Sequence, residues 1–291
     1  MCNVKTKSNL AMLLKQISAM SIAALTLTGC YVEVSHEHEA YVDTEVTYAN
    51  NITDYSTKFL VDAALIPFVL TAESPYMVIN PDSYTTPRTR NLSRALITET
   101  TYAYLFDNWD CDYGGYTQTE AEANTTSYDD GYTFVELTMN AKANDCEVVS
   151  QGSFHLVNSN VNYDVTGWYD DWEHEVSSIE AELTGSVQID YNGKFISHSG
   201  MNFEASTLSA SDFTYDGSST VVLDDGVDIQ QVTMTTRNDV HIYLGMDHPH
   251  AGKIRFKQFD YDVTLEFDSQ GVTRTDSNSY SRYRTWSELG F

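Results

Sequence analysis

The chain has 291 residues and a formal charge of −26, from 42 acidic against 16 basic side chains. This balance argues against a nucleic-acid-binding protein, because binding to a phosphate backbone requires a basic surface. Aromatic residues make up 12% of the chain, which excludes an intrinsically disordered protein and is enough for a real hydrophobic core.

The chain begins with a short apolar leader. Lys5, Lys7 and Lys15 are its only charges, and residues 17–28 are all apolar or small. A basic start, a short apolar run and a small-residue end are typical of a secretory signal peptide. The run is shorter than the roughly 20 apolar residues that a membrane-spanning helix needs. We therefore expect residues 1–29 to be removed on export.

The leader ends in Leu27-Thr28-Gly29-Cys30, which resembles the lipobox of bacterial lipoproteins. The resemblance implies that Cys30 becomes the first mature residue and carries a diacylglycerol, usually with a third acyl chain on its amine. Two or more chains anchor a protein stably, since each buried CH₂ contributes about 0.8 kcal/mol. The following residue is Tyr31 and not Asp, which by this resemblance implies the outer membrane, on its periplasmic or surface face. The alternative is an ordinary secretory signal with an accidental cysteine.

Residues 30–50 are expected to form an acidic tether. Loss of three lysines with the leader leaves 13 basic against 42 acidic residues, a charge of −29. This charge disfavours adhesion to anionic lipid and leaves the acyl chains as the membrane contact. The tether carries His36 and His38, and a second i, i+2 pair, His248 and His250, lies in a Pro-containing turn. Such pairs can bind Zn²⁺ or Cu²⁺; the alternative is solvated loop histidines.

One helix is predicted, over Asn51–Ala72. Its apolar residues recur at i, i+3, i+4 spacing and are Phe59, Leu60, Ala63, Ala64 and Phe68. Thr53 or Asp54 can cap it, and Pro67 would kink or end it. We expect this helix to pack against the sheet. Residues 73–94 hold three of the five prolines and indicate irregular surface chain.

From about residue 95 the apolar period changes to two, which is typical of strands. The longest run consists of odd-numbered residues, which share one face of a strand: Ile179, Ala181, Leu183, Val187, Ile189 and Tyr191. Asn192-Gly193 follows directly and predicts a type I′ hairpin turn. Turn signals divide the rest into about ten to thirteen strands, without helical patterns between them.

These patterns predict a mainly β fold with one short N-terminal helix. The strands should form a single antiparallel meander, as an open curved sheet, a sandwich or a half-barrel, with one apolar and one polar face. We expect residues 51–291 to form a single β-rich domain, because neither an interdomain linker nor a strict repeat occurs in them.

Four cysteines sort by position. Cys2 leaves with the leader, and Cys30 takes lipid by the lipobox resemblance. Cys111 and Cys146 then remain as an even pair in an oxidising compartment, which predicts a disulfide. It would close a loop of about 36 residues and contribute about 4 kcal/mol in the chain-entropy model. The alternative, free thiols or metal ligands, has no accompanying CxxC spacing.

The region around these cysteines resembles uncharacterised proteobacterial β-rich lipoproteins. The motifs that carry the resemblance are Cys111-Asp112-Tyr113-Gly114-Gly115, Asn144-Asp145-Cys146, Gln151-Gly152-Ser153 and the segment Gly252–Leu265. It covers roughly half the chain, Cys111–Thr275, and implies further hairpins. It implies no activity.

Aromatic residues gather at two places. Trp109 lies beside the first of the paired cysteines, and Trp168, Tyr169 and Trp172 surround an acidic turn. Rings beside carboxylates often bind sugars, because rings stack on the apolar face of a sugar while acids bind its hydroxyls. The alternative is that they are amphipathic side chains at sheet edges and in the core.

Enzyme motifs are missing from the sequence, which has no G-x-S-x-G, no G-x-G-x-x-G and no Walker lysine loop. His198, Ser199 and His241 could act as base or nucleophile, but on strands such residues are more often polar-face side chains. The acidic cluster at 108–112 has part of the oxygen spacing of a calcium loop but lacks its final Glu. We therefore expect no enzyme activity and no cofactor.

Together these features predict a lipid-anchored envelope protein with a non-catalytic binding or structural module. Its partners would be the membrane, through the anchor, and a lipid, a glycan or an envelope protein; nucleic acid is not expected. A lipid carrier would need the odd-numbered face of 179–191 to line a cavity and not a filled core. The alternatives are a surface glycan-binding module that uses the Trp/Tyr clusters, and then a hydrolase.

Overall fold

The computed structural model describes the chain from residue 51 onward, with gaps. The described ranges are 51–67, 97–111, 113–150, 153–170, 175–191, 193–209, 212–243 and 248–291. The expected signal peptide, the lipobox and the tether with His36 and His38 lie outside these residues, and so does Trp172.

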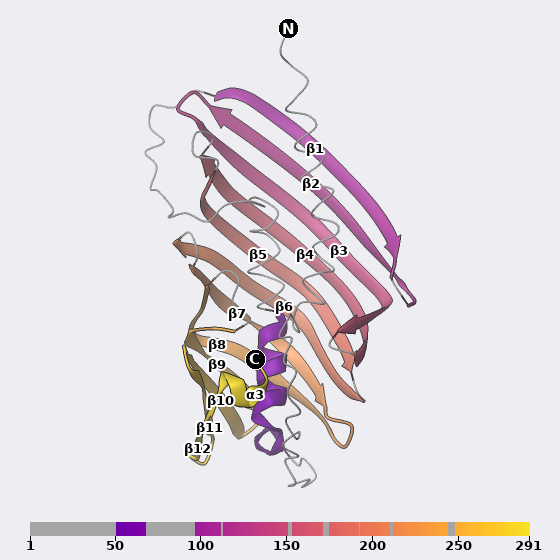
Figure 1. Ribbon diagram of the computed structural model, residues 1–291, viewed down its shortest axis with the longest axis vertical. Helices are drawn as coiled ribbons and strands as arrows, with labels where there is room; N and C mark the ends of the chain where they lie inside the picture. Colours follow the sequence, from indigo (N-terminus) through magenta and orange to yellow (C-terminus); the bar gives the residue numbers. More distant parts are fainter. Residues whose placement is uncertain are drawn as a thin grey trace.

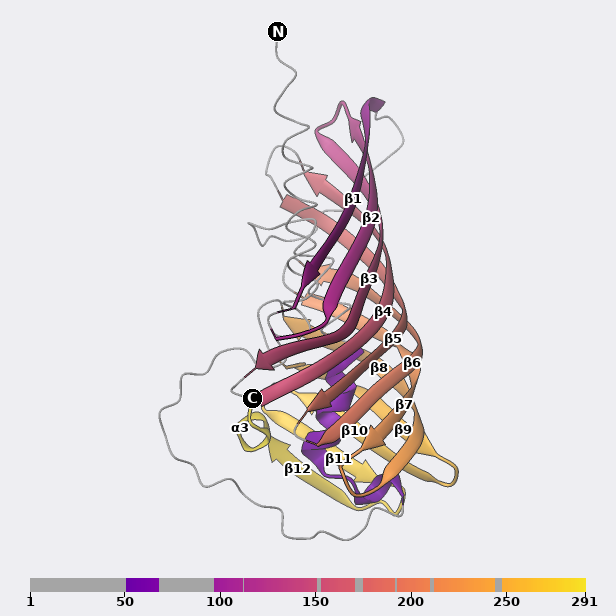
Figure 2. The ribbon, with the colours of Figure 1, turned by 90° about the vertical axis from the view of Figure 1, so that its right-hand side faces the viewer.

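In the described part of the chain, twelve strands form one sheet, and each pairs antiparallel with its neighbours in the sequence (Figure 1). The strands are β1 (Ile97–Asp110), β2 (Tyr116–Tyr128), β3 (Tyr132–Ser150), β4 (Ser153–Asp170), β5 (Glu175–Tyr191), β6 (Lys194–Ser209), β7 (Asp212–Asp224), β8 (Ile229–Tyr243), β9 (Ala251–Gln258), β10 (Tyr261–Asp268), β11 (Gly271–Asp276) and β12 (Ser281–Thr285). This order confirms the predicted antiparallel meander. The sheet is open, with β1 and β12 at its edges, and it is curved (Figure 2).

The predicted hairpin joins β5 to β6. Tyr191 pairs with Lys194, so the connection has two residues. Gly193 has a φ of 74°, a left-handed conformation that a type I′ turn requires and that glycine adopts without strain. The register therefore confirms the predicted two-residue hairpin. Asn192 lies outside the described residues, so the type I′ geometry stays a prediction.

The core lies on the concave face of the sheet. The odd-numbered residues of β5 that the sequence placed on one face are at most 7% exposed: Ile179, Ala181, Leu183, Val187 and Ile189. They belong to the same buried cluster as the apolar residues of the N-terminal helix. The ribbon shows that helix on the concave side, over the C-terminal half of the sheet (Figures 1 and 2).

The N-terminal helical segment begins later than predicted. A separate 3-10 turn, η1 (Ile52–Asp54), comes first and is capped by Asn51. The α-helix then covers residues 57–67, and its cap is Ser56, whose Oγ lies 3.2 Å from the backbone N of Phe59. Capping by Thr53 or Asp54 was therefore wrong, because both residues belong to η1.

The helical face follows the predicted spacing. Its buried residues include Phe59, Leu60, Ala63 and Ala64, each at most 2% exposed. The stretch from Phe68 to Ala72 lies outside the described residues. A further helical turn, α3 (Trp286–Leu289), follows β12 and buries Trp286 against the core; the sequence analysis did not predict it.

Arg274 on β11 fastens the η1 segment to the sheet. Its guanidinium donates to the backbone carbonyls of Thr53 and Tyr55, and its Nε donates to Asp276 Oδ1 at 2.7 Å. The Tyr55 hydroxyl in turn donates to the carbonyl of Leu223 at 2.9 Å. The guanidinium of Arg274 is planar and carries several N–H donors, so it can bind these acceptors at the same time. Directed hydrogen bonds as well as apolar contacts therefore hold the η1 segment against the sheet.

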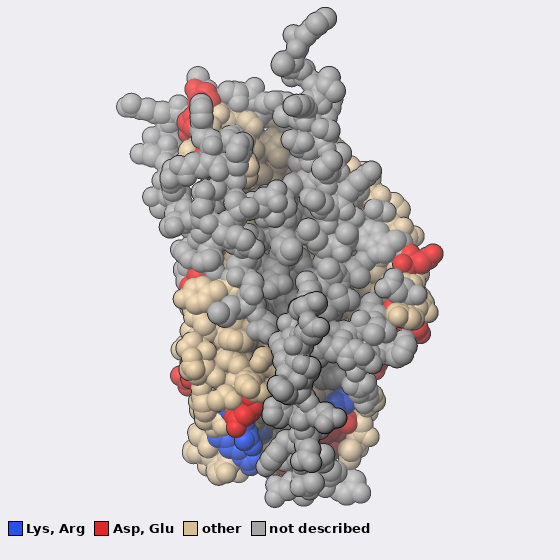
Figure 3. All heavy atoms as spheres, in the orientation of Figure 1, with Lys and Arg blue, Asp and Glu red and all other residues tan. Residues whose placement is uncertain are grey.

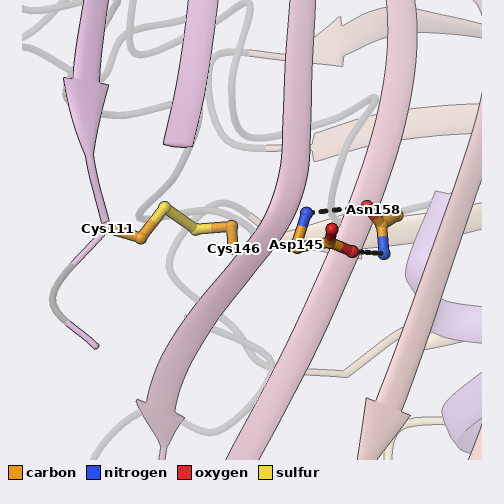
Figure 4. The surroundings of a disulfide bond; sticks show 4 residues. All are labelled: Cys111, Asp145, Cys146 and Asn158. Carbon is orange, nitrogen blue, oxygen red and sulfur yellow. Dashed lines mark hydrogen bonds between the residues drawn. A yellow bond between two sulfur atoms is a disulfide. The ribbon is translucent and has the colours of Figure 1, made fainter. Parts of the chain in front are cut away.

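The predicted disulfide forms between Cys111 and Cys146, whose Cα atoms are 5.6 Å apart (Figure 4). Cys111 directly follows β1 and Cys146 lies on β3, so the disulfide joins the loop between β1 and β2 to the strand on the far side of β2. A bulge in β3 places the second cysteine, and there Asp145 adopts a φ of 46°. Asn158 holds this bulge by accepting from Asp145 N at 2.8 Å and donating to its carboxylate at 3.1 Å.

The outward, convex face is strongly acidic. Four acids on neighbouring strands stand directly opposite one another, all exposed, in the order Asp164, Glu182, Glu204 and Asp216. We call this set the acidic ladder. Basic side chains appear near the lower end of the molecule in Figure 3. The last four strands, β9–β12, carry Lys253, Arg255, Lys257, Arg282 and Arg284 in addition to the buried Arg274. The sheet therefore has an acidic N-terminal half and a mixed C-terminal end.

Candidate functional site

Three exposed aromatic side chains follow the edge strand β1. Tyr102, Tyr104 and Phe106 are 59%, 51% and 54% exposed. They occupy alternate positions and so share one face of the strand, and at about 3.3 Å per residue they form a row about 13 Å long. Their neighbour Ala103 pairs with the buried Ala123, which places the row on the convex face. We call these three residues the aromatic row.

Both tyrosines of the row reach across to β2. Tyr104 donates its hydroxyl to Glu120 Oε1 at 3.0 Å, and this hydrogen bond raises the pKa of Tyr104. Loss of hydration, together with the charge and hydrogen bond of Glu122, raises the pKa of Tyr102. Each partner lies two positions beyond the residue directly opposite in the register. The rings therefore lean the same way across the β1–β2 seam and remain more than half exposed.

A depression of about 450 Å³ lies beside the row, on the convex face of β2–β4 and β5. Its lining is mostly polar and consists of Glu120, Ala121, Glu122, Thr138, Met139, Asn140, Asn162, Tyr163, Asp164 and Thr184. Asn140 donates its amide to Asn162 Oδ1 at 2.7 Å and to Asn160 Oδ1 at 3.0 Å. Glu120 and Glu122 serve both features, because they line the depression and also hold the tyrosines.

This arrangement can bind a hydroxyl-rich ligand. Rings that expose a face can stack on apolar C–H surface, while carboxylates and amides exchange hydrogen bonds with hydroxyl groups. β1 supplies the rings, β2 the acids, and β3 and β4 the amides. Strand pairing holds the backbones of all three groups in one register, so the rings, acids and amides lie side by side on one face.

The structure places the predicted aromatic residues elsewhere. Trp168 lies on the convex face, where its ring packs 4.7 Å from Phe134 and 5.7 Å from Tyr128, between centroids. Tyr169 lies on the opposite face and packs against the core. The backbone of Trp109 pairs in β1 with Thr117, and its side chain is outside the described residues. Trp168 and Tyr169 therefore do not share a surface, and a ligand role for Trp168 stays a prediction.

The aromatic row was missed by the sequence analysis. The signal was present as Tyr-x-Tyr-x-Phe at 102–106, which alternates like a strand. Alternation shows that the three rings share a face, but it does not show which face is buried. Only the pairing of β1 with β2 decides that.

The predicted metal-binding histidines separate as well. His248 stacks on Trp286, with 4.4 Å between ring centroids, whereas His250 lies 3.2 Å from a carboxylate oxygen of Asp212. His241, considered as a base from the sequence, lies beside the same Asp212. The two histidines of the i, i+2 pair therefore contact different partners, and His250 belongs to a cluster with Asp212 and His241.

Comparison with known proteins gives no relative. No protein-family model, no curated protein and no solved structure matches the chain. Within the described residues, every helix falls short of the length and apolar character needed to cross a membrane.

Proposed function

We propose that this protein is a lipid-anchored, non-catalytic module of the bacterial cell envelope that binds a glycan on the convex face of β1–β4. The observation that carries the glycan assignment is the aromatic row beside a depression lined with acids and amides. The resemblance of residues 27–30 to a lipobox supports the anchor, and Tyr31 after Cys30 supports an outer-membrane location. The strong acidity of the chain supports a neutral or cationic ligand over an anionic one.

Binding is favoured over hydrolysis by the setting of the acids. Glu120, Glu122 and Asp164 are all exposed to water on an open face. A general acid for glycosidic cleavage requires a carboxyl group whose pKa is raised by an apolar pocket. Exposed carboxylates instead serve as hydrogen-bond acceptors for sugar hydroxyls.

A glycan is favoured over a carried lipid by the packing of the concave face. The odd-numbered residues of β5 belong to the main buried cluster, together with the helix that covers the sheet. A carrier would use such residues to line a cavity, whereas burial against neighbouring side chains is the arrangement of a filled core. The polar convex face, with its exposed rings, remains as the surface for a ligand.

The test is retention by polysaccharides. The mature chain with Cys30→Ser is run through native gels that contain soluble neutral polysaccharides, and is also mixed with insoluble peptidoglycan. Replacing one ring by Tyr104→Ala should weaken retention about fivefold to tenfold, because a stacked ring contributes about 1–1.5 kcal/mol. The melting temperature should change little, since the ring is half exposed.

Tyr283 provides a matched control. It is 46% exposed on the other edge strand, β12, and its hydroxyl donates to Asp268 at 3.3 Å. Tyr283→Ala therefore removes the same kind of side chain and the same kind of hydrogen bond, far from the depression in the strand order. Equal retention of Tyr104→Ala, Tyr283→Ala and the parent protein, or no retention of the parent on any of these polysaccharides, would refute the proposed surface.

A further inference from the structure

We propose that Asp212, His241 and His250 form a binding site for a single Zn²⁺-like divalent ion. Potential ligand atoms of the three side chains all lie within 4.8 Å of one another. The site lies on strands other than those of the proposed glycan surface, so either proposal can fail without the other. It also departs from the expectation that the protein needs no cofactor.

Strand pairing brings the first two ligands together. Asp212 begins β7 and pairs with Tyr243 at the end of β8, and His241 pairs with Thr214. Asp212 and His241 are therefore diagonal neighbours on one face of the sheet, at a spacing that allows their side chains to meet. The intervening Phe213 is buried on the other face.

The third ligand comes from the segment before β9. The backbone N–H of His250 donates to the carbonyl of His241 at 2.9 Å, which fixes His250 beside the end of β8. Tyr243 stacks on the His250 ring, with 3.9 Å between centroids and 11° between planes. This contact holds the imidazole in one orientation, with its Nε2 directed at Asp212.

The distances suit an ion after a small contraction. His250 Nε2 lies 3.2 Å from Asp212 Oδ1, and His241 Nδ1 lies 3.9 Å from Asp212 Oδ2. Tetrahedral ligands at about 2.0–2.1 Å from Zn²⁺ are about 3.3 Å from one another. Of the three ligand pairs, the Asp212–His250 pair already has this spacing. The two pairs that include His241 lie within 4.8 Å and would shorten by side-chain rotation of His241.

The donor set indicates the class of metal. Two imidazoles and one carboxylate favour Zn²⁺ and related transition ions, whereas Ca²⁺ and Mg²⁺ prefer oxygen ligands throughout. The side chains of Asp212, His250 and His241 are 17%, 16% and 29% exposed, so the cluster faces water on one side. Water or a ligand group would complete the coordination there.

The experiment measures Zn²⁺ binding by calorimetry to the mature protein carrying Cys30→Ser, His36→Ala and His38→Ala. These histidine substitutions remove the other i, i+2 pair, which lies in the tether. We expect one ion per chain. Asp212→Asn and His250→Gln should each weaken binding by about tenfold or more, as expected for loss of a ligand. Co²⁺ should give visible absorption bands of a low-coordinate site, which the two variants lose.

His248→Gln is the matched control, because this ring is two residues away but stacks on Trp286. This substitution should change Zn²⁺ affinity by less than about twofold, whereas loss of a ligand should weaken it about tenfold. Circular dichroism without metal verifies that each variant is folded. The proposal is overturned if the parent shows no saturable binding, if Asp212→Asn and His250→Gln bind as the parent does, or if binding needs His36 and His38.

Discussion

His198 is a fully buried histidine under the N-terminal helix, close to the backbone of Ala63. Its Nδ1 lies 2.9 Å from the hydroxyl of Ser219, which is also buried. Burial lowers the pKa of His198 to about 3, from an ordinary 6.5, because the charged form loses its hydration. The folded protein therefore holds this imidazole neutral.

This residue should make the fold acid-sensitive. Between pH 6.5 and 3 the unfolded chain binds a proton at His198 and the folded chain does not, so stability falls as pH falls. His198 alone can change the free energy of unfolding by at most about 1.4 kcal/mol per pH unit. His198→Gln should be less stable than the parent at pH 7, and the difference should narrow below pH 6.5. Urea unfolding of both proteins from pH 7 to pH 4 measures this; a constant difference would contradict the assignment.

At the scale of elements, the acidic ladder places like charges opposite one another on four neighbouring strands. Directly opposed like charges destabilise a sheet, and salt screens them. Asp216 also accepts a hydrogen bond from the Thr236 hydroxyl, so one end of the ladder is partly compensated. The middle members have an acid on both sides.

Glu204→Gln should therefore raise stability at low salt, by about 0.5–1 kcal/mol. Glu266→Gln is the matched comparison, because Glu266 stands opposite Lys253 and forms a 2.9 Å ion pair. That change should lower stability, by at most about 1 kcal/mol, since both side chains of the pair are partly exposed to water. Thermal unfolding measures the stability change of each variant at low salt and at 1 M salt. The two changes should have opposite signs, and both should become smaller at 1 M salt, where the Debye length is about 3 Å. If both substitutions changed stability in the same direction, the arrangement of charges would not be the cause of the changes.

The elements themselves were largely predictable, because they depend on local pattern. Alternation placed the face of β5 correctly, and Asn-Gly placed the turn after it. The helix cap was misplaced, because Asn51 and Asp54 form their own capping box and leave Ser56 as the start of the α-helix. Local rules of this kind identify candidate caps but do not rank two that lie close together.

The candidate sites were less predictable, because they depend on register between strands. Asp212 and His241 meet only through the pairing of β7 with β8, which a bulge shifts between Tyr215 and Ser218. His250 was chosen for its neighbour His248, and the structure gives it a different partner. Sequence spacing shows which residues share a strand face, but not which strands bring them together.

At the scale of the whole molecule, the resemblance of residues 27–30 to a lipobox leads to a prediction about location. If Cys30 carries acyl chains, the protein should fractionate with the outer membrane and need detergent for release. Cys30→Ser should leave the same folded domain soluble in the periplasm, because the remaining chain has a charge of −29 and no attraction to anionic lipid. Fractionation followed by immunoblotting measures this. Unchanged, detergent-dependent fractionation of Cys30→Ser would refute the anchor.

The hydrogen bonds that hold the η1 segment against β11 have a consequence for the order in which the protein folds. Every described strand of the sheet pairs with a strand next to it in the chain, so pairing can proceed in chain order as the polypeptide is synthesised. The segment at Thr53 and Tyr55 emerges before any of these strands, yet it is held by Arg274, more than 200 residues later. The hydrogen bonds between Arg274 and this first segment can therefore form only after β11 has been synthesised. A chain that stops before β11 lacks the Arg274 hydrogen bonds and holds this segment only through its contacts with earlier strands, such as the hydrogen bond from Tyr55 to Leu223.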